Sequence, residues 1–324
     1  MKVCIIADPG KLGRMLGGQL CDNPVMNRLL IIGSGDVAQR AMPWLIQRFK
    51  VFALVRRPEA AVCWRSLGAK PVLADLDDAA SLARLAGLAQ NILICAPPPD
   101  SGRDDPRIRR LLAVLGRGRH GLRRIVYVST TGVYGDCGGA VVREHCWPAP
   151  QSARGQRRLA AETRLRAHAI GSGGALSILR APGIYAAERL SLVRLERGDP
   201  VLRLEDDVFT NHVHADDLAH AACLALFRGP HLRVFNACDD SDLRMGDYYD
   251  AMADLAGLPR PPRLSRDECA DRLSALTMSF MSESRRLRND RIKRELRWRP
   301  RYPDVVYGLR VAFAQRQDSD QKGN

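Results

Sequence analysis

The residues best placed to do chemistry are two glycines that directly follow an apolar run. Residues 29–32 lead into Gly33-Ser34-Gly35, and a helical pattern starts at once, with Ala38 where a third glycine would stand. Gly33 permits a tight turn, Gly35 lets the backbone approach a pyrophosphate, and the free N–H groups at the helix start attract phosphate. This spacing predicts a dinucleotide cradle formed by Gly33, Ser34, Gly35, Asp36 and Val37.

Arginines follow the second apolar run, where the choice between two dinucleotides is made. A site for NAD usually carries Asp or Glu at the end of the second strand, which binds the ribose hydroxyls. This chain has Val55-Arg56-Arg57 at that place. Because a guanidinium fork matches phosphate oxygens, Arg56 and Arg57 predict a 2′-phosphate there, joined by Arg40 from the first helix. The sequence therefore favours NADP over NAD.

Histidines and cysteines are candidates for a metal site or a nucleophile. His212 and His214 are two residues apart, which places both on one face of a strand, but too few further ligands accompany them for a metal. We interpret them as connecting residues, and the following Asp216 and Asp217 as helix caps. The nine cysteines include no Cys-x-x-Cys and have no evident base partner, so we expect free thiols in a reducing compartment.

The composition is that of an ordinary globular protein with a basic balance. The chain has 324 residues, 46% hydrophobic and 27% charged, with a net charge of +14, and only six of its 50 basic residues are lysines. The arginines are spread along the chain with no basic run among aromatics, so we expect no nucleic-acid partner. No apolar stretch reaches the length of a membrane span and no secretory signal is evident, so we expect a cytoplasmic protein without a membrane partner.

The elements that must position these residues alternate along the chain. Short apolar runs separated by helical patterns predict a parallel sheet buried on both faces. With right-handed crossovers this is a Rossmann-type α/β fold, a doubly wound parallel sheet with a smaller carboxyl-terminal α/β lobe. The expected strands are residues 29–32, 51–55, 71–74, 91–95, 124–129 and 176–179, and two expected helices are residues 107–115 and 156–168.

The pattern also predicts how the chain divides. Residues 1–26 precede the alternating pattern as an extension of uncertain role, with Met26 as an alternative start. Residues 27–180 are expected to form the NAD(P)-binding domain. Proline and glycine become frequent after that, so residues 181–314 are expected to form a lobe that closes over the strand ends. Residues 315–324 are polar and are expected to be a disordered tail.

A fifth apolar run ends in Ser129-Thr130-Thr131, followed by Gly132-Val133-Tyr134-Gly135. This segment is similar to the extended short-chain dehydrogenase/reductase superfamily, the NAD-dependent epimerase/dehydratase group. Further segments with this likeness follow in order at residues 144–150, 180–185, 211–219, 234–237 and 289–303, so the resemblance spans residues 27–312. The short glycine pattern and an altered catalytic helix most resemble the atypical, YeeZ-like members. The resemblance implies an oxidoreductase or epimerase/dehydratase that acts on a carbonyl or a sugar-like small molecule.

The resemblance also implies roles for single residues. In the family a Ser or Thr orients the substrate and a Tyr exchanges the proton, with a Lys four residues later that lowers the pKa of the Tyr. Thr130 matches the Ser/Thr, but Arg154 and Arg158 stand at the Tyr and Lys positions. Arginine is a very poor base, whereas Arg158 as a cation could hold the nicotinamide ribose. The resemblance further places Asp75 and Leu76 beside the adenine, Ala96 and Pro97 against the cofactor, and Pro182 beside the nicotinamide.

The missing Tyr and Lys leave three explanations open. Another group exchanges the proton, with Tyr134 and Tyr185 as the candidate phenols; or the hydride chemistry is slow or uses an unusual substrate; or the chain is a catalytically silent NAD(P)-binding sensor or scaffold. Tyr134 could equally be a packing residue at a strand end, and Arg154 and Arg158 a solvated helix face. We take Thr130, Tyr134 and Arg158 as the candidate catalytic residues and NADP as the cofactor, with NAD as the second choice. The expected partner is a small-molecule substrate, and a homodimer is compatible with this interpretation.

Overall fold

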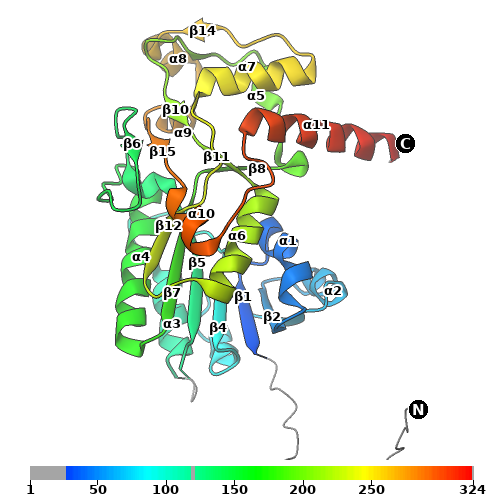
Figure 1. The fold of residues 1–324 in the computed structure, drawn as a ribbon, viewed down its shortest axis with the longest axis vertical. Coiled ribbons are helices and arrows are strands. Elements are labelled where there is room, and N and C mark those ends of the chain that lie inside the picture. Colours follow the sequence, from blue (N-terminus) through cyan, green and yellow to red (C-terminus); the bar gives the residue numbers. More distant parts are fainter. Residues whose placement is uncertain (1–26, 118–120, 323–324) are drawn as a thin grey trace, which may run out of the picture.

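The central feature of the molecule is a sheet of seven parallel strands (Figure 1), in the order β12-β7-β5-β4-β1-β2-β3. The computed structural model describes residues 27–117 and 121–322, so the extension at residues 1–26 lies outside the described residues. The strands are β1 (Arg28–Ile32), β2 (Lys50–Val55), β3 (Lys70–Leu73), β4 (Asn91–Ile94), β5 (Arg124–Thr130), β7 (Ala175–Ala181) and β12 (Arg233–Asn236). Every predicted strand is present, and its bounds agree to within two residues.

The apolar runs are continuous because the sheet is buried on both faces. In β1, Leu29 and Ile31 belong to one core cluster, while Leu30 and Ile32 belong to another. All four side chains are fully buried. Since side chains alternate between the two faces of a strand, a strand covered on both sides has no position for a polar residue.

Helices cover both faces, which confirms the predicted doubly wound architecture. The first face is covered by α1 (Asp36–Leu45), α2 (Pro58–Ser66) and α6 (Ala215–Arg228), and the second by η1 (Ser81–Leu85), α3 (Pro106–Leu115) and α4 (Ala153–Ser172). Trp64 and Leu218 pack in the first core cluster, and Leu111 and Leu165 pack in the second.

A second region lies above the carboxyl edge of the sheet, where α7 (Met245–Ala256), α8 (Arg266–Arg272), α9 (Ala275–Phe280) and α11 (Val305–Lys322) lie together (Figure 1). Its own core contains Tyr185, Met252 and Leu309. The remaining elements of the chain are η2 (Thr131–Tyr134), β6 (Val141–Val142), β8 (Gly183–Tyr185), η3 (Ala187–Arg189), α5 (Val193–Glu196), β9 (Val201–Leu202), β10 (Phe209–Thr210), β11 (His212–His214), β13 (Leu243–Arg244), α7 (Met245–Ala256), β14 (Arg263–Leu264), α8 (Arg266–Arg272), α9 (Ala275–Phe280), β15 (Arg286–Leu287), α10 (Asp290–Leu296) and α11 (Val305–Lys322).

The chain returns to the sheet after it has entered this second region. Helix α6 packs against α1, and β12 is the edge strand beside β7. Alanines make up much of α6, and their small side chains let the helix approach the sheet closely. A single boundary at residue 180 therefore does not describe the two regions, because each is built from more than one segment of the chain.

The end of the chain departs from the prediction. Helix α11 continues to Lys322, so the expected disordered tail from Gln315 is wrong as far as residue 322. The side chain of Arg316 contributes to this order, because its Nη1 donates to the carbonyl of Leu190 at 3.2 Å. Residues 323–324 lie outside the described residues.

The two histidines of β11 are packing residues. His212 stacks on Tyr248, and the ring of His214 packs at a tilt against the ring of Tyr302, with ring centroids 4.2 and 3.9 Å apart. Burial lowers the pKa of His212 to about 3, so its ring is neutral near pH 7. Nδ1 of His214 accepts a hydrogen bond from the backbone N–H of Asp216, which makes His214 the cap of α6.

The caps predicted at Asp216 and Asp217 are therefore wrong. The carboxylate of Asp217 instead accepts hydrogen bonds from the backbone N–H groups of Arg301 and Tyr302, and so fastens the segment before α11.

Within residues 27–117 and 121–322 we find no group of His, Cys, Asp or Glu that could hold a metal ion, and no helix long and apolar enough to cross a membrane.

Candidate functional site

The turn after β1 requires glycine at its first position. Gly33 has φ +94°, and a Cβ added there would lie 2.2 Å from the backbone nitrogen of Ala96. The N–H groups of Cys95 and Ala96 both donate to the carbonyl of Ile32, at 2.7 and 3.0 Å, which holds the ends of β1 and β4 together. The turn is close-packed because two adjacent strands end at the same place.

The fold itself does not require glycine at position 35. It is the N-cap of α1 with φ −93°, a conformation open to any residue, and no described side chain caps the helix. A Cβ on Gly35 would meet no heavy atom within 4 Å. The N–H groups of Asp36, Val37 and Ala38 make no hydrogen bond to another described group, as is expected of a helix start that can bind an anion.

A cleft of ≈ 760 Å³ opens at the carboxyl ends of the strands, directly above this turn. This is where ligands bind in open α/β sheets, beside the strands at which the chain order reverses. Thirteen of the predicted site residues line it: Gly33, Ser34, Gly35, Val37, Arg56, Arg57, Asp75, Leu76, Ala96, Pro97, Thr130, Arg158 and Pro182.

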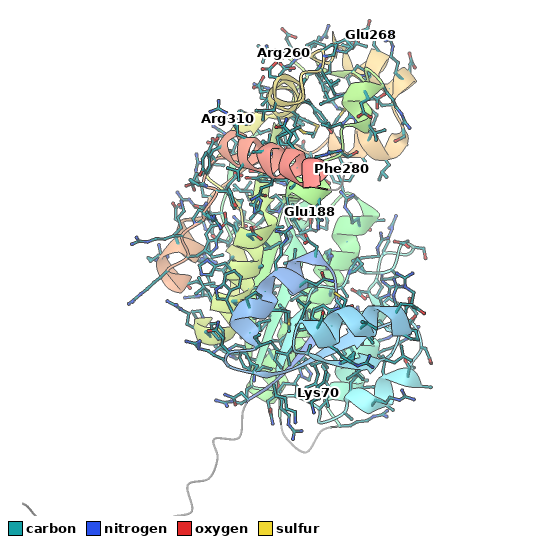
Figure 2. All side chains as sticks on the ribbon, turned by 90° about the vertical axis from the view of Figure 1, so that its right-hand side faces the viewer. Lys70, Glu188, Arg260, Glu268, Phe280 and Arg310 are labelled. Carbon is teal, nitrogen blue, oxygen red and sulfur yellow. The ribbon has the colours of Figure 1, made fainter. Side chains whose placement is uncertain are left out.

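Three predicted site residues do not line the cleft, and the prediction differs most from the structure at Arg40. Its guanidinium forms ion pairs with Asp36 and Asp216, both at 2.6 Å, and with Glu188 at 2.7 Å. Glu188 lies between the sheet layer and the upper region (Figure 2). Arg40 thus ties α1 to that region, and neither Arg40 nor Asp36 is among the residues that line the cleft.

Tyr134 is the third predicted site residue outside the cleft. Its side chain is 2% exposed, and its hydroxyl donates to Oδ1 of Asn236 at 2.7 Å. Burial raises the pKa of Tyr134 to about 12, although the Arg180 guanidinium over its ring acts in the opposite direction. The structure therefore favours the packing alternative for Tyr134. Tyr185, the other candidate phenol, is buried in the core of the upper region.

The end of β5 presents Thr130 to the cleft. Oγ1 of Thr130 accepts a hydrogen bond from the N–H of Gly132 at 3.2 Å, which caps the short helix η2. Since a hydroxyl has one proton and two lone pairs, its proton remains available for a ligand. Among the described side chains no acceptor takes it.

Helix α4 brings three arginines to the same end of the cleft: Arg154, Arg157 and Arg158. Nη1 of Arg158 donates to the carbonyls of Ala96 and Val128 and to the hydroxyl of Tyr127, at 3.0 to 3.2 Å. The guanidinium of Arg158 is therefore fixed against the ends of β4 and β5. The alternative of a solvated helix face is wrong for Arg158.

Arg157 is a lining residue that no motif predicts, and its side chain is only 8% exposed. The signal in the sequence is the spacing 154, 157, 158, because residues three and four apart share a helix face. Arg107 and Arg189 also line the cleft, but they come from segments with no recognisable motif.

A buried polar network lies behind the cleft. Glu162 of α4 is fully buried and accepts hydrogen bonds from Ser129 at 2.6 Å and from Nη2 of Arg180 at 2.7 Å. The guanidinium of Arg180 lies 4.6 Å from the ring centre of Tyr134. This network links α4 to β5 and β7, and so fixes the helix that carries the three arginines.

Comparison with known proteins agrees with this geometry. A sequence profile of NAD(P)H-binding proteins matches residues 33–228, from the glycine turn to the end of α6. No curated protein matches the sequence. A functionally unknown conserved protein from Silicibacter pomeroyi has a similar structure, with 28% identity and a TM-score of 0.72, over 89% of this chain and 99% of that chain.

Two solved epimerases share the fold. A UDP-glucose 4-epimerase from Thermotoga maritima, solved with UDP-glucose, is 18% identical with a TM-score of 0.71, over 91% of this chain and 99% of its own. A UDP-glucuronic acid 4-epimerase from Bacillus cereus, solved with UDP-glucuronic acid and NAD, is 17% identical with a TM-score of 0.70, over 90% of this chain and 99% of its own. At these identities the likeness concerns the fold.

Proposed function

The chain belongs to the NAD(P)H-binding family, and on this premise we propose that it is an oxidoreductase or epimerase of the atypical extended short-chain dehydrogenase/reductase type. The observation that carries the proposal is a cleft in which the Gly33–Gly35 turn after β1 lies between the ends of β2 and β3 on one side and Thr130 at the end of β5 on the other. A dinucleotide bound with its pyrophosphate at this turn would extend along the edge of the sheet in both directions, with its nicotinamide towards Thr130.

The lining residues fit a dinucleotide along the whole cleft. The free N–H groups of α1 and the open space above Gly35 suit the pyrophosphate. Asp75 and Leu76 would lie beside the adenine, and Arg158 would face the ribose next to the nicotinamide. When bound, the nicotinamide ring supplies or accepts the hydride.

The polar groups at the reacting end would bind and polarise a carbonyl. Thr130 offers a hydroxyl proton to the substrate oxygen, and Arg154 offers N–H groups that stay charged at any working pH. Tyr134 does not reach this place, and burial raises its pKa to about 12. Thr130 would therefore orient and polarise the substrate oxygen through a hydrogen bond from its hydroxyl, and Tyr134 would not exchange the proton.

Replacing Thr130 with valine tests this role. We expect kcat for NADPH-dependent reduction to fall about 100-fold, in the range found when one hydrogen-bond donor to the reacting oxygen is removed. The assay follows NADPH absorbance with a panel of aldehydes, ketones and nucleotide sugars, the last because two similar solved structures are epimerases of UDP-sugars. Thr130→Ser keeps the hydroxyl and should keep most of the activity.

A hydroxyl of the same helix–sheet layer provides the control. Oγ1 of Thr163 donates to the carbonyl of Leu159 within α4 and does not line the cleft, so Thr163→Val should leave kcat unchanged. An active wild-type protein whose Thr130→Val variant turns over equally fast would contradict the role of Thr130.

We further propose that the cofactor is NADP, because Arg56 and Arg57 line the cleft at the end of β2. Neither has an ion-pair or hydrogen-bond partner among the described side chains, so both guanidinium groups are free to bind a 2′-phosphate. A hydrogen bond to a charged group contributes about 1.5–3 kcal/mol. Replacing either arginine with glutamine should therefore weaken NADPH binding at least about tenfold.

Fluorescence titration with NADPH and NADH measures this preference. NADH affinity should change less than twofold, because NADH lacks the 2′-phosphate. Arg65→Gln is the matched control, since Arg65 is exposed on α2 and does not line the cleft. Equal loss of NADPH and NADH in the Arg56 and Arg57 variants would show that these arginines do not read the 2′-phosphate.

A catalytically silent NAD(P)-binding sensor is the second candidate function. The observation that favours it is the loss of the proton-exchanging pair, because arginines stand at both positions. Tight NADPH binding without turnover of any compound in the panel, in wild type and Thr130→Val alike, would favour the sensor over the enzyme.

A further inference from the structure

We propose that the reacting end of the cleft binds a negatively charged group of the substrate, a carboxylate or phosphate, between Arg154 and Arg157. This inference rests on the proposed function, because it assumes that a dinucleotide occupies the rest of the cleft. It assigns to Arg154, at the position of the family's tyrosine, the task of recognising the substrate.

The cleft carries more positive charge than the described carboxylates around it balance. Seven arginines and two aspartates line it among the described residues. Arg107 is paired with Asp77, its Nε lying 2.9 Å from the carboxylate, and Arg189 is paired with Asp36 at 3.2 Å. Arg56 and Arg57 lie at the adenosine end. The unbalanced charge that remains is on α4.

The guanidinium of Arg154 is held in place without being neutralised. Its Cζ lies over the ring of Phe280, 4.2 Å from the ring centre, so the aromatic ring covers one side of it. Phe280 lies in the upper region (Figure 2). No carboxylate within the described residues lies within 4 Å of Arg154, and its N–H edge makes no hydrogen bond to them. A guanidinium that an aromatic ring holds on one side, and whose N–H groups are free, is suited to bidentate binding of an oxyanion.

Arg157 supplies the second and buried half of the subsite. Its side chain is 8% exposed, and Nη1 donates to the carbonyl of Gly102 at 2.6 Å. Its Nε is buried without a partner among the described groups. No described carboxylate pairs with Arg157, and since buried charged groups are usually paired, an anion bound in the cleft would supply the missing counter-charge.

The subsite lies beside Thr130. The start of α4 packs on the turn after Thr130, because a Cβ on Gly155 would lie 2.6 Å from the carbonyl of Gly132. A Cβ on Gly132 would in turn lie 3.6 Å from Oγ1 of Thr130. An anionic group held by Arg154 would therefore be close to the oxygen that Thr130 orients.

The nearby carboxylates are already paired or hydrogen-bonded. Glu283 forms an ion pair with Arg285 at 2.9 Å, and Glu162 forms one with Arg180. Asp105 accepts a hydrogen bond from the N–H of Ile108 and caps α3. None of these groups neutralises Arg154 or Arg157, although Glu283 contributes an attractive field at Arg154.

Titration calorimetry with small probes on the full chain tests the proposal. The probes are oxamate as a carboxylate, methylphosphonate as a phosphate mimic, and oxamide as an uncharged relative of oxamate. Each is titrated into protein saturated with NADPH and into protein alone. We expect oxamate or methylphosphonate to bind at least about tenfold more tightly than oxamide, and the tighter of the two identifies the anion.

Arg154→Met and Arg157→Met should each weaken binding of the anionic probe about tenfold or more, while NADPH affinity changes less than twofold. Arg164→Met is the matched control. Arg164 also ties α4 to the loop before α3, through Asp104, but it does not line the cleft. Arg154→Lys keeps the charge without the fork and should give an intermediate loss.

Three results would overturn the inference. Oxamate and oxamide could bind equally, or no probe could bind, or the Arg154 variants could lose NADPH and the probe in parallel, which would assign these arginines to the cofactor. If the protein bound oxamate or methylphosphonate but not oxamide, and did not bind NADPH, the anion subsite would be supported and the proposed function contradicted. Failure of the subsite and failure of the proposed function are therefore distinguishable.

Discussion

Gly35→Val is expected to remove NADPH binding from a protein that still folds. Valine at this position would place two methyl groups in the space above the start of α1, where an added Cβ meets no protein atom within 4 Å. Loss of the close approach removes backbone hydrogen bonds to charged oxygens, each about 1.5–3 kcal/mol, so NADPH affinity should fall at least about 100-fold. The measurement is a fluorescence titration together with a thermal melt.

The backbone conformation of Gly35 allows this variant to be tested without a loss of stability. Gly35 has φ −93° and ψ −173°, a conformation that valine adopts without strain, so the melting temperature should change by less than about 3 °C. Gly171→Val on α4 is the control, since Gly171 is also open and lies far from the cleft lining. A folded Gly35→Val protein that binds NADPH like the wild type would show that the pyrophosphate does not lie on this turn.

Gly33 shows that the neighbouring glycine has a structural role instead. Its φ of +94° and the backbone of Ala96 at 2.2 Å from an added Cβ leave no room for alanine. Gly33→Ala should therefore reduce stability as well as binding. The sequence predicts the turn role for Gly33, and the position of β4 is the reason that no side chain fits there.

The fold was predictable because each strand carries its own signal. A parallel strand that is buried on both faces must be apolar throughout, and the sequence shows this directly at β1 and β4. The glycine turn was predictable for the same reason, since its chemistry is local. The atypical short-chain dehydrogenase/reductase resemblance agrees with the NAD(P)H-binding profile and with the epimerase-like fold.

Side-chain roles that depend on distant partners were not predictable. Arg40 stands at a suitable place for a phosphate, but Glu188 and Asp216, far along the chain, take its charge. Tyr134 follows the family pattern, yet its hydroxyl is taken by Asn236, 102 residues later. A motif gives the position of a residue in an element, whereas its partners depend on the tertiary packing.

Arg157 on α4 is the reverse case, a residue that lines the cleft but that no motif predicts. Arg157 follows no motif, and its importance comes from burial and from an Nε that no described group satisfies. The helix start is fixed by the close contact of Gly155 with Gly132. The positions of Arg154 and Arg157 on the helix therefore predict that both lie on one face of α4. The packing of α4 on η2 directs that face towards the cleft.

Glu162→Leu is expected to cost about 3–5 kcal/mol of the free energy of unfolding, the largest stability effect we predict for one side chain. Glu162 is fully buried and binds Arg180, which is 2% exposed, as well as Ser129. Without the carboxylate, the Arg180 guanidinium stays buried beside Tyr134 with no counter-charge. Chemical denaturation monitored by circular dichroism measures the loss.

The double variant Glu162→Leu with Arg180→Met separates the ion pair from the burial of a single charge. Removing both partners leaves no uncompensated charge, so the double variant should be more stable than Glu162→Leu alone. Glu295→Gln is the surface control, because its pair with Arg233 is partly exposed and should contribute less than about 1 kcal/mol. If the double variant were as unstable as the sum of the two single changes, the network would stabilise the fold by packing and not by charge compensation. The orientation of α4, and with it the position of Arg154, Arg157 and Arg158 in the cleft, would then depend on side-chain shape.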